Sequence, residues 1–100
     1  IFASLIAHAQ GWVQEGGHLQ NDSAYLVIEG TNAHFTASGN STIGMLGNDA
    51  TIKLLGNWTN NTATGLFLGN DGKVVMHGGN QNVAGSQSTL FPGFVTQGSG

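Results

Sequence analysis

The chain has 100 residues, of which 7% are charged, and its formal net charge is −3. Its two basic residues, Lys53 and Lys73, cannot form the basic stripe that neutralises phosphates, which excludes nucleic acid and disfavours an anionic membrane surface as partners. The sequence contains no cysteine, which excludes a disulfide scaffold and a thiolate zinc site.

The first nine residues are similar to the end of a secretory signal peptide. Residues 1–6 are mostly apolar, and Ala7-His8-Ala9 places small residues at the two positions that signal peptidase reads. We therefore expect cleavage after Ala9, a mature protein that starts at Gln10, and export to the cell surface or the medium. The alternative is a short buried strand or helix. The run is too short for a membrane span, which needs about 20 apolar residues.

Short strands separated by turns are expected over the rest of the chain. Thr, Val, Ile and aromatic residues, which favour strands, are interrupted by Gly and Asn, which favour turns. No window keeps an apolar period of 3.6 residues, so no helix is expected. The predicted strands cover residues 24–30, 33–37, 42–46, 50–55, 65–68, 73–77 and 90–96.

A repeated turn-plus-strand unit indicates how these strands are arranged. Residues 48–56 align without gaps on residues 70–78, and residues 21–30 match with one extra residue. The second and fourth residues before the closing glycine are apolar in every unit, which gives each strand one inward face. These inward pairs are Leu26 and Ile28, Ile52 and Leu54, and Val74 and Met76.

The repeat predicts an all-β solenoid, a right-handed parallel β-helix of the pectin-lyase-like kind. A strand repeat of this length gives about four coils, and the last is incomplete at the C-terminus. A β-sandwich of hairpins is the competing architecture, because it also uses short strands with frequent turns. A sandwich, however, has no reason to repeat one unit at near-constant spacing. We expect residues 10–100 to be one solenoid segment of a longer protein.

Two segments resemble a known class of proteins. Residues 55–61 (LGNWTNN), followed by residues 72–86, are similar to large exported proteins of Bacteroidota. In those proteins a GNWTNN turn precedes the pattern G-x-V-x-F-x-G-x-x-x-Q-x-I-x-G. Here Met76 replaces the usual Phe and Val83 replaces Ile. The resemblance implies a β-helical surface or secreted protein, similar to the substrates of the type IX secretion system.

Residues that could carry chemistry are few. Asp22, Asp49 and Asp71 occupy the same position in the three units. Stacked carboxylates could share Ca²⁺, but Asn-Asp pairs also cap turns through hydrogen bonds, and we favour the turns. A polysaccharide lyase or hydrolase would need acids clustered with Arg or Lys, or two facing carboxylates, and the chain has no Arg. We therefore predict no catalytic residue, no metal site and no cofactor.

Three residues are candidates for recognition or modification. Trp12 and Trp58 could stack on glycans, although an aromatic residue in such a coil more often fills the core. Ser23 lies in Asp22-Ser23-Ala24, which resembles the O-glycosylation triplet of exported Bacteroidota proteins.

The predicted function is non-enzymatic: a structural stalk or adhesin-like segment of an exported protein. Its expected partners are surface glycans, other cell-surface proteins and downstream domains of the same polypeptide. The alternative is a carbohydrate-binding or polysaccharide-degrading β-helix protein whose active site lies outside these residues.

Overall fold

The computed structural model describes residues 6–97, which form twelve strands and no helix. The first face, sheet A, contains β1 (Ile6–Ala9), β4 (Tyr25–Ile28), β7 (Thr51–Leu54), β10 (Lys73–Met76) and β12 (Phe94–Thr96). The second face, sheet B, contains β2 (Trp12–Glu15), β5 (Phe35–Gly39), β8 (Trp58–Thr62) and β11 (Val83–Ala84). The third face, sheet C, contains β3 (His18–Asp22), β6 (Thr42–Leu46) and β9 (Phe67–Leu68).

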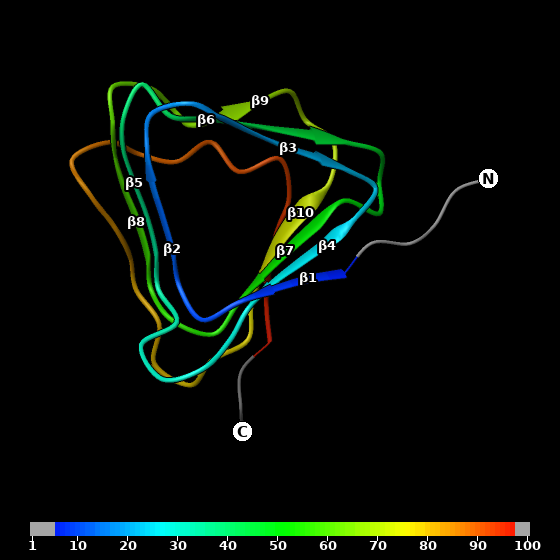
Figure 1. The fold of residues 1–100 in the computed structure, drawn as a ribbon, viewed down its shortest axis with the longest axis vertical. Helices are drawn as coiled ribbons and strands as arrows, with labels where there is room; N and C mark the ends of the chain where they lie inside the picture. Colours follow the sequence, from blue (N-terminus) through cyan, green and yellow to red (C-terminus); the bar gives the residue numbers. More distant parts are fainter. Residues whose placement is uncertain (1–5, 98–100) are drawn as a thin grey trace.

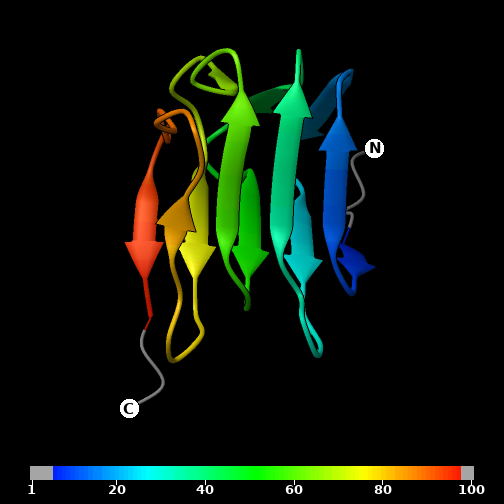
Figure 2. The ribbon, with the colours of Figure 1, turned by 90° about the vertical axis from the view of Figure 1, so that its left-hand side faces the viewer.

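The chain visits the three faces in turn, so that successive strands of each face pair in parallel (Figure 1). Figure 1 shows the coils end-on, and Figure 2 shows sheet B from the side with its strands in one row. From the N-terminal end the chain turns clockwise as it recedes, so the solenoid is right-handed. The prediction of a parallel β-solenoid is confirmed, whereas a hairpin sandwich would need antiparallel pairs.

The inward ladder of sheet A has the register that the repeat predicts. Leu26 pairs with Ile52 and Ile52 with Val74, and the second inward row lies two residues further along each strand. All six side chains of the two rows are at most 8% exposed. Burying one such side chain contributes roughly 1.5–3 kcal/mol, and a one-residue slip would turn the whole row to water.

Aromatic residues fill the interior behind sheet B. The rings of Phe35 and Trp58 stack with their centroids 3.9 Å apart and their planes 10° apart. Phe67 stacks on the same indole at 5.8 Å, and Phe91 contacts it at 5.1 Å in a tilted arrangement. The stacked pair follows directly from the parallel register, because Phe35 and Trp58 are paired residues of β5 and β8.

Buried polar side chains bind backbone groups near the points where the chain turns from one face to the next. Backbone groups at such corners leave the strand ladders and need other partners. Asn60 is fully buried, and its Nδ2 donates to the carbonyls of Thr64 and Ser88, each at 3.3 Å. Its Oδ1 accepts from the backbone N–H of Thr62 at 3.0 Å. Asn21 acts similarly at another corner, where its Nδ2 donates to the Thr51 carbonyl at 3.1 Å.

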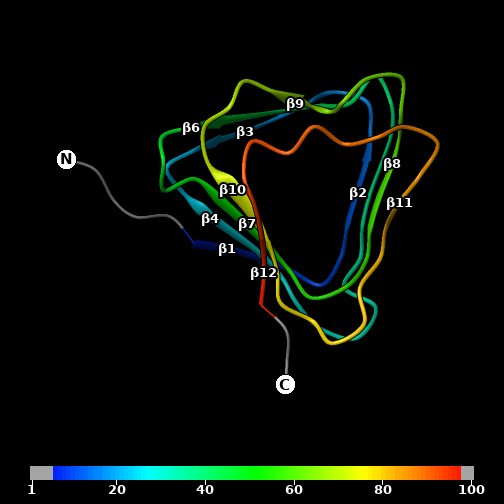
Figure 3. The same cartoon turned by 180° about the vertical axis from the view of Figure 1, so that it is seen from behind.

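Two of the three closing glycines of the repeat, Gly56 and Gly78, are required by close approach between coils. A Cβ on Gly56 would overlap the backbone carbonyl of Ala33, and a Cβ on Gly78 would overlap that of Leu55. Both glycines follow strands of sheet A, at the corner that leads toward sheet B (Figure 3). The repeated residues therefore specify both the inward ladder and the tight corner that follows it.

Several strands lie outside the predicted ranges. Trp58–Thr62 belongs to the GNWTNN motif, which the resemblance implies is a turn, but it forms strand β8, so that expectation is wrong. The motif lacks an apolar alternation because its inward residues after the tryptophan, Asn60 and Thr62, are polar and buried. The other strands outside the ranges are β2, β3 and β11, and β1, which lies within the predicted signal peptide.

Replacement of Ile52 by alanine should lower the free energy of unfolding by about 2–5 kcal/mol, because it opens a cavity in the inward ladder. Chemical denaturation of the purified chain measures this change. The matched control is Leu46→Ala, at a side chain that is 57% exposed on the middle strand of sheet C. Equal losses at both positions would contradict the assignment of Ile52 to the core.

Replacement of Asn60 by leucine should cost about 1–3 kcal/mol despite the added apolar surface, since buried backbone groups lose their partners. The same denaturation experiment checks it, with the exposed Asn40→Leu as the control. A stabilised Asn60→Leu variant would show that the corner does not depend on the amide.

Candidate functional site

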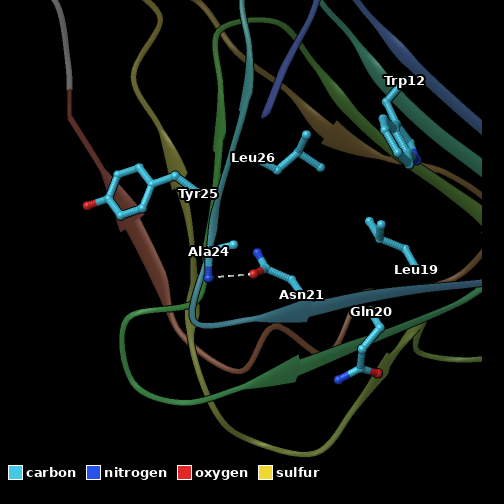
Figure 4. A pocket seen from close by; sticks show the side chains of 7 residues that line it. All are labelled: Trp12, Leu19, Gln20, Asn21, Ala24, Tyr25 and Leu26. Atoms are coloured by element: carbon cyan, nitrogen blue, oxygen red, sulfur yellow. Dashed lines mark hydrogen bonds between the residues drawn. The ribbon is translucent and has the colours of Figure 1, made fainter. Parts of the chain in front are cut away.

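A cavity of about 200 Å³ lies at the N-terminal end of the solenoid. Figure 4 shows Trp12 of β2, Leu19 of β3 and Leu26 of β4 pointing toward this shared space. Trp12 and Leu19 belong to the first coil and are half-buried, so their apolar surfaces border the cavity. The remaining lining residues are Gln20, Asn21, Ala24 and Tyr25.

The chemistry of this cavity suits an apolar group. The indole N–H of Trp12 is directed to Oε1 of Gln14 at 3.4 Å, and Gln14 is itself buried. Asn21 uses its amide on the backbone of Thr51 and Ala24. The polar groups are thus engaged within the fold, and the cavity offers mainly the indole and leucine side chains to an aliphatic group or the apolar face of a sugar.

Trp58, the second predicted glycan-stacking residue, does not reach the surface. Its side chain is 0% exposed, one face of its ring lies against Phe35, and its indole N–H donates to Oγ1 of Thr89 at 3.0 Å. A sugar has no access to a ring in this position, so the prediction at Trp58 is wrong. Trp58 instead fills the core, which is the more frequent role of an aromatic residue in such a coil.

Ser23 lies in the turn between β3 and β4 and is exposed. Its backbone has a positive φ of 54°, and its Oγ donates to the carbonyl of Leu46 at 3.3 Å. The N–H of Ser23 donates to the same carbonyl at 2.8 Å, which fixes the turn on the next coil. The hydroxyl is therefore accessible in a defined turn, and its O-glycosylation stays a prediction.

The three turn aspartates do not form a stack. Asp22 ends strand β3 and pairs with Leu46, three residues before Asp49, so it occupies a different position from the other two. Asp71 uses Oδ2 to accept from the backbone N–H of Gly47 at 3.2 Å, so it contacts the turn of the preceding coil. Among the described residues no group of three or more His, Asp or Glu side chains could hold a metal ion.

One polar row on sheet C was missed by the sequence reasoning. His18, Gln20 and Asp22 alternate along the outer face of β3 and are hydrogen-bonded in sequence: Nε2 of His18 to Oε1 of Gln20 at 2.7 Å, and Nε2 of Gln20 to Oδ1 of Asp22 at 2.6 Å. Because the Gln20 oxygen can only accept, His18 donates from Nε2, and its Nδ1 faces Oγ1 of Thr42 at 2.8 Å. The row lies over Gly44, where a Cβ would overlap the Gln20 side chain. The sequence signal that could have identified this row is the alternation of the polar residues His18, Gln20 and Asp22, with Leu19 between the first two.

Comparison of the chain with protein-family models, with curated proteins and with solved structures finds no match. Nothing in residues 6–97 is a helix of the length and apolarity that would cross a bilayer. The interpretation of the site therefore depends on its own residues.

The two tryptophans should differ in their access to solvent. In a Trp58→Phe variant the remaining fluorescence comes from Trp12, and it should be quenched readily by acrylamide, because Trp12 borders an open cavity. In a Trp12→Phe variant the remaining indole is fully buried and should resist the quencher. Similar quenching constants in the two variants would contradict this placement.

Proposed function

We propose that residues 10–100 act as a non-enzymatic structural segment, a stalk or adhesin-like spacer, of an exported protein. The observation that carries the proposal is the parallel ladder of sheet A, which within residues 10–97 joins β4, β7, β10 and β12, with buried aliphatic rows that run through β4, β7 and β10. Such an arrangement gives a stiff unit in which each coil is held by its neighbours, as in other repeat proteins.

The outer surface of sheet B also suits a solvated spacer. Thr36 pairs with Thr59, and Ser38 pairs with Asn61, so that small neutral polar residues follow one another across the outer face of β5 and β8. The whole chain carries 7% charged residues. A surface of this kind is hydrated without a strong electrostatic field that would attract charged partners.

Export is proposed from the sequence. Cleavage after Ala9 would remove β1, which pairs with β4 alone among the described strands, and would leave the ladders of β2 to β12 unchanged. The similarity of residues 55–61 and 72–86 to exported Bacteroidota proteins supports a cell-surface or secreted location, type IX secretion, and downstream domains on the same polypeptide.

Mass spectrometry of the protein released by its source cells tests this export. We expect an N-terminal peptide that starts at Gln10, with residues 1–9 missing, and labelling of intact cells or the medium by antibodies against residues 10–100. A retained peptide that spans Ala9 and Gln10, or labelling only after lysis, would contradict export by this signal.

A carbohydrate-binding role is the second candidate, and the cavity beside Trp12 is the observation that favours it. A glycan array probed with the purified chain separates the two roles. An inert spacer should give no specific signal. A strong signal that Trp12→Ala removes and the exposed control Val13→Ala keeps would overturn the spacer proposal in favour of glycan recognition.

A further inference from the structure

A threonine hydroxyl on the outer face of sheet C is directed at an imidazole. Strands β3 and β6 lie side by side on this face, and His18 and Thr42 are paired residues (Figure 1). Oγ1 of Thr42 lies 2.8 Å from Nδ1 of His18. Because Nε2 of the neutral ring donates to Oε1 of Gln20 at 2.7 Å, Nδ1 carries no hydrogen and accepts. The hydroxyl of Thr42 is therefore the donor, and a base receives its hydrogen bond.

The backbone of Thr42 is fixed on both sides. Its N–H donates to the carbonyl of Gly17 at 2.9 Å, and its carbonyl accepts from Nε2 of the buried Gln14 at 3.0 Å. Since a β-branched side chain has few χ1 rotamers, a fixed backbone also restricts where the hydroxyl points. The contact with the imidazole thus has a defined geometry although it lies at the surface.

Gln20 and Asp22 hold the imidazole from its other side. Nε2 of Gln20 donates to Oδ1 of Asp22 at 2.6 Å, so the amide that fixes the ring is itself fixed by a carboxylate. The side chains of His18 and Gln20 lie over Gly44, where a Cβ would overlap the Gln20 side chain. A hydroxyl that is hydrogen-bonded to a base, with the base oriented by a third group, is the arrangement of an activated nucleophile.

We propose that Thr42 is a modification site that accepts an acyl group from an activated ester. Its hydroxyl oxygen forms a bond with the carbonyl carbon of the ester, and the hydroxyl proton passes to Nδ1 of His18. The bond between that carbon and the leaving oxygen then breaks, and the alcohol departs with the proton from His18. The products are an ester on Thr42 and one free alcohol. This stoichiometric reaction goes beyond the spacer role, and it needs no assumption about export.

The surroundings of Thr42 favour a neutral acyl donor over an anionic one such as a phosphate. The three described strands of sheet C contain a single charged residue, Asp22, so they offer no cation to an anion. A Cβ on Gly17 would meet no atom within 4 Å, so the turn next to His18 leaves open space. Leu68 pairs with residue 44 of β6 and is 57% exposed, which places aliphatic surface on the same face. A small ester with an apolar acyl group fits these features.

Incubation of the 100-residue chain with p-nitrophenyl acetate tests the proposal. We expect an acetyl group that peptide mapping places on Thr42 and that alkaline hydroxylamine removes. Amides formed on Lys53, Lys73 or the N-terminus resist this treatment. Thr42→Val should lose the hydroxylamine-sensitive acetyl group, whereas Thr42→Ser, which keeps the hydroxyl, should retain it. His18→Asn should slow its formation by about 100-fold, at the lower end of what a general base contributes.

Further variants separate activation of Thr42 from a structural role. Gln20→Leu should slow acetylation because the ring loses its acceptor, and Gln20→Glu, which keeps an acceptor for Nε2, should restore it. The matched control Thr59→Val removes another half-buried hydroxyl, on the outer face of β8, and should react like the unmodified chain. Circular dichroism verifies that each variant is folded. If one is not, the position of the acetyl group on the unmodified chain decides.

Three results would overturn the proposal. The first is a hydroxylamine-sensitive acetyl group on a residue other than Thr42 in the unmodified chain. The second is such a group that persists in folded Thr42→Val, because the imidazole would then be the nucleophile. The third is an unchanged rate in folded His18→Asn.

Discussion

The fold depends on one constraint, which is that equivalent residues of successive coils remain in parallel register on every face. Leu26, Ile52 and Val74 are neighbours in space although 26 residues separate the first two and 22 the last two. The difference in coil length is absorbed largely in the corners. Glu29–His34 joins β4 to β5, whereas the shorter segment 55–57 joins β7 to β8. The strands keep their inward rows because a slip of one residue would expose every aliphatic side chain in a row.

The buried amide side chains supply hydrogen bonds that the parallel ladders cannot provide where the coil bends. A coil that bends twice or more per turn must leave some backbone groups without ladder partners, and these groups lie near the dry interior. Asn21, Asn60 and Gln14 supply the missing donors and acceptors from side chains that are at most 8% exposed. The interior therefore combines aliphatic rows with buried strand amides that bind backbone groups near the corners.

The sequence predicts those parts of the fold in which apolar residues alternate. The inward pairs of β4, β7 and β10 were identified because Leu, Ile, Val and Met stand two residues apart before a glycine, and β6 was predicted with its observed bounds. Strand β8 was missed because its inward positions after Trp58 are polar, and no pattern of hydrophobicity distinguishes a buried amide from a solvated one. Trp58 was named as a possible glycan-stacking residue beside the more frequent core role, and its full burial against Phe35 corresponds to the core role. Trp12 could be named from the sequence, but its cavity depends on residues of three strands that only the register brings together.

Disulfide trapping between coils tests the central claim most directly, since the chain has no cysteine of its own. Thr36 and Thr59 are paired residues of neighbouring parallel strands, whose spacing of about 4.8 Å lies within the range that a disulfide can span. A Thr36→Cys, Thr59→Cys variant should therefore form an intramolecular disulfide on mild oxidation, read as protection from alkylation in the intact mass. The pair Val13→Cys, Thr59→Cys, two strands apart at about 10 Å, should remain reduced. A disulfide in the second pair and none in the first would contradict the stacking of coils in this register.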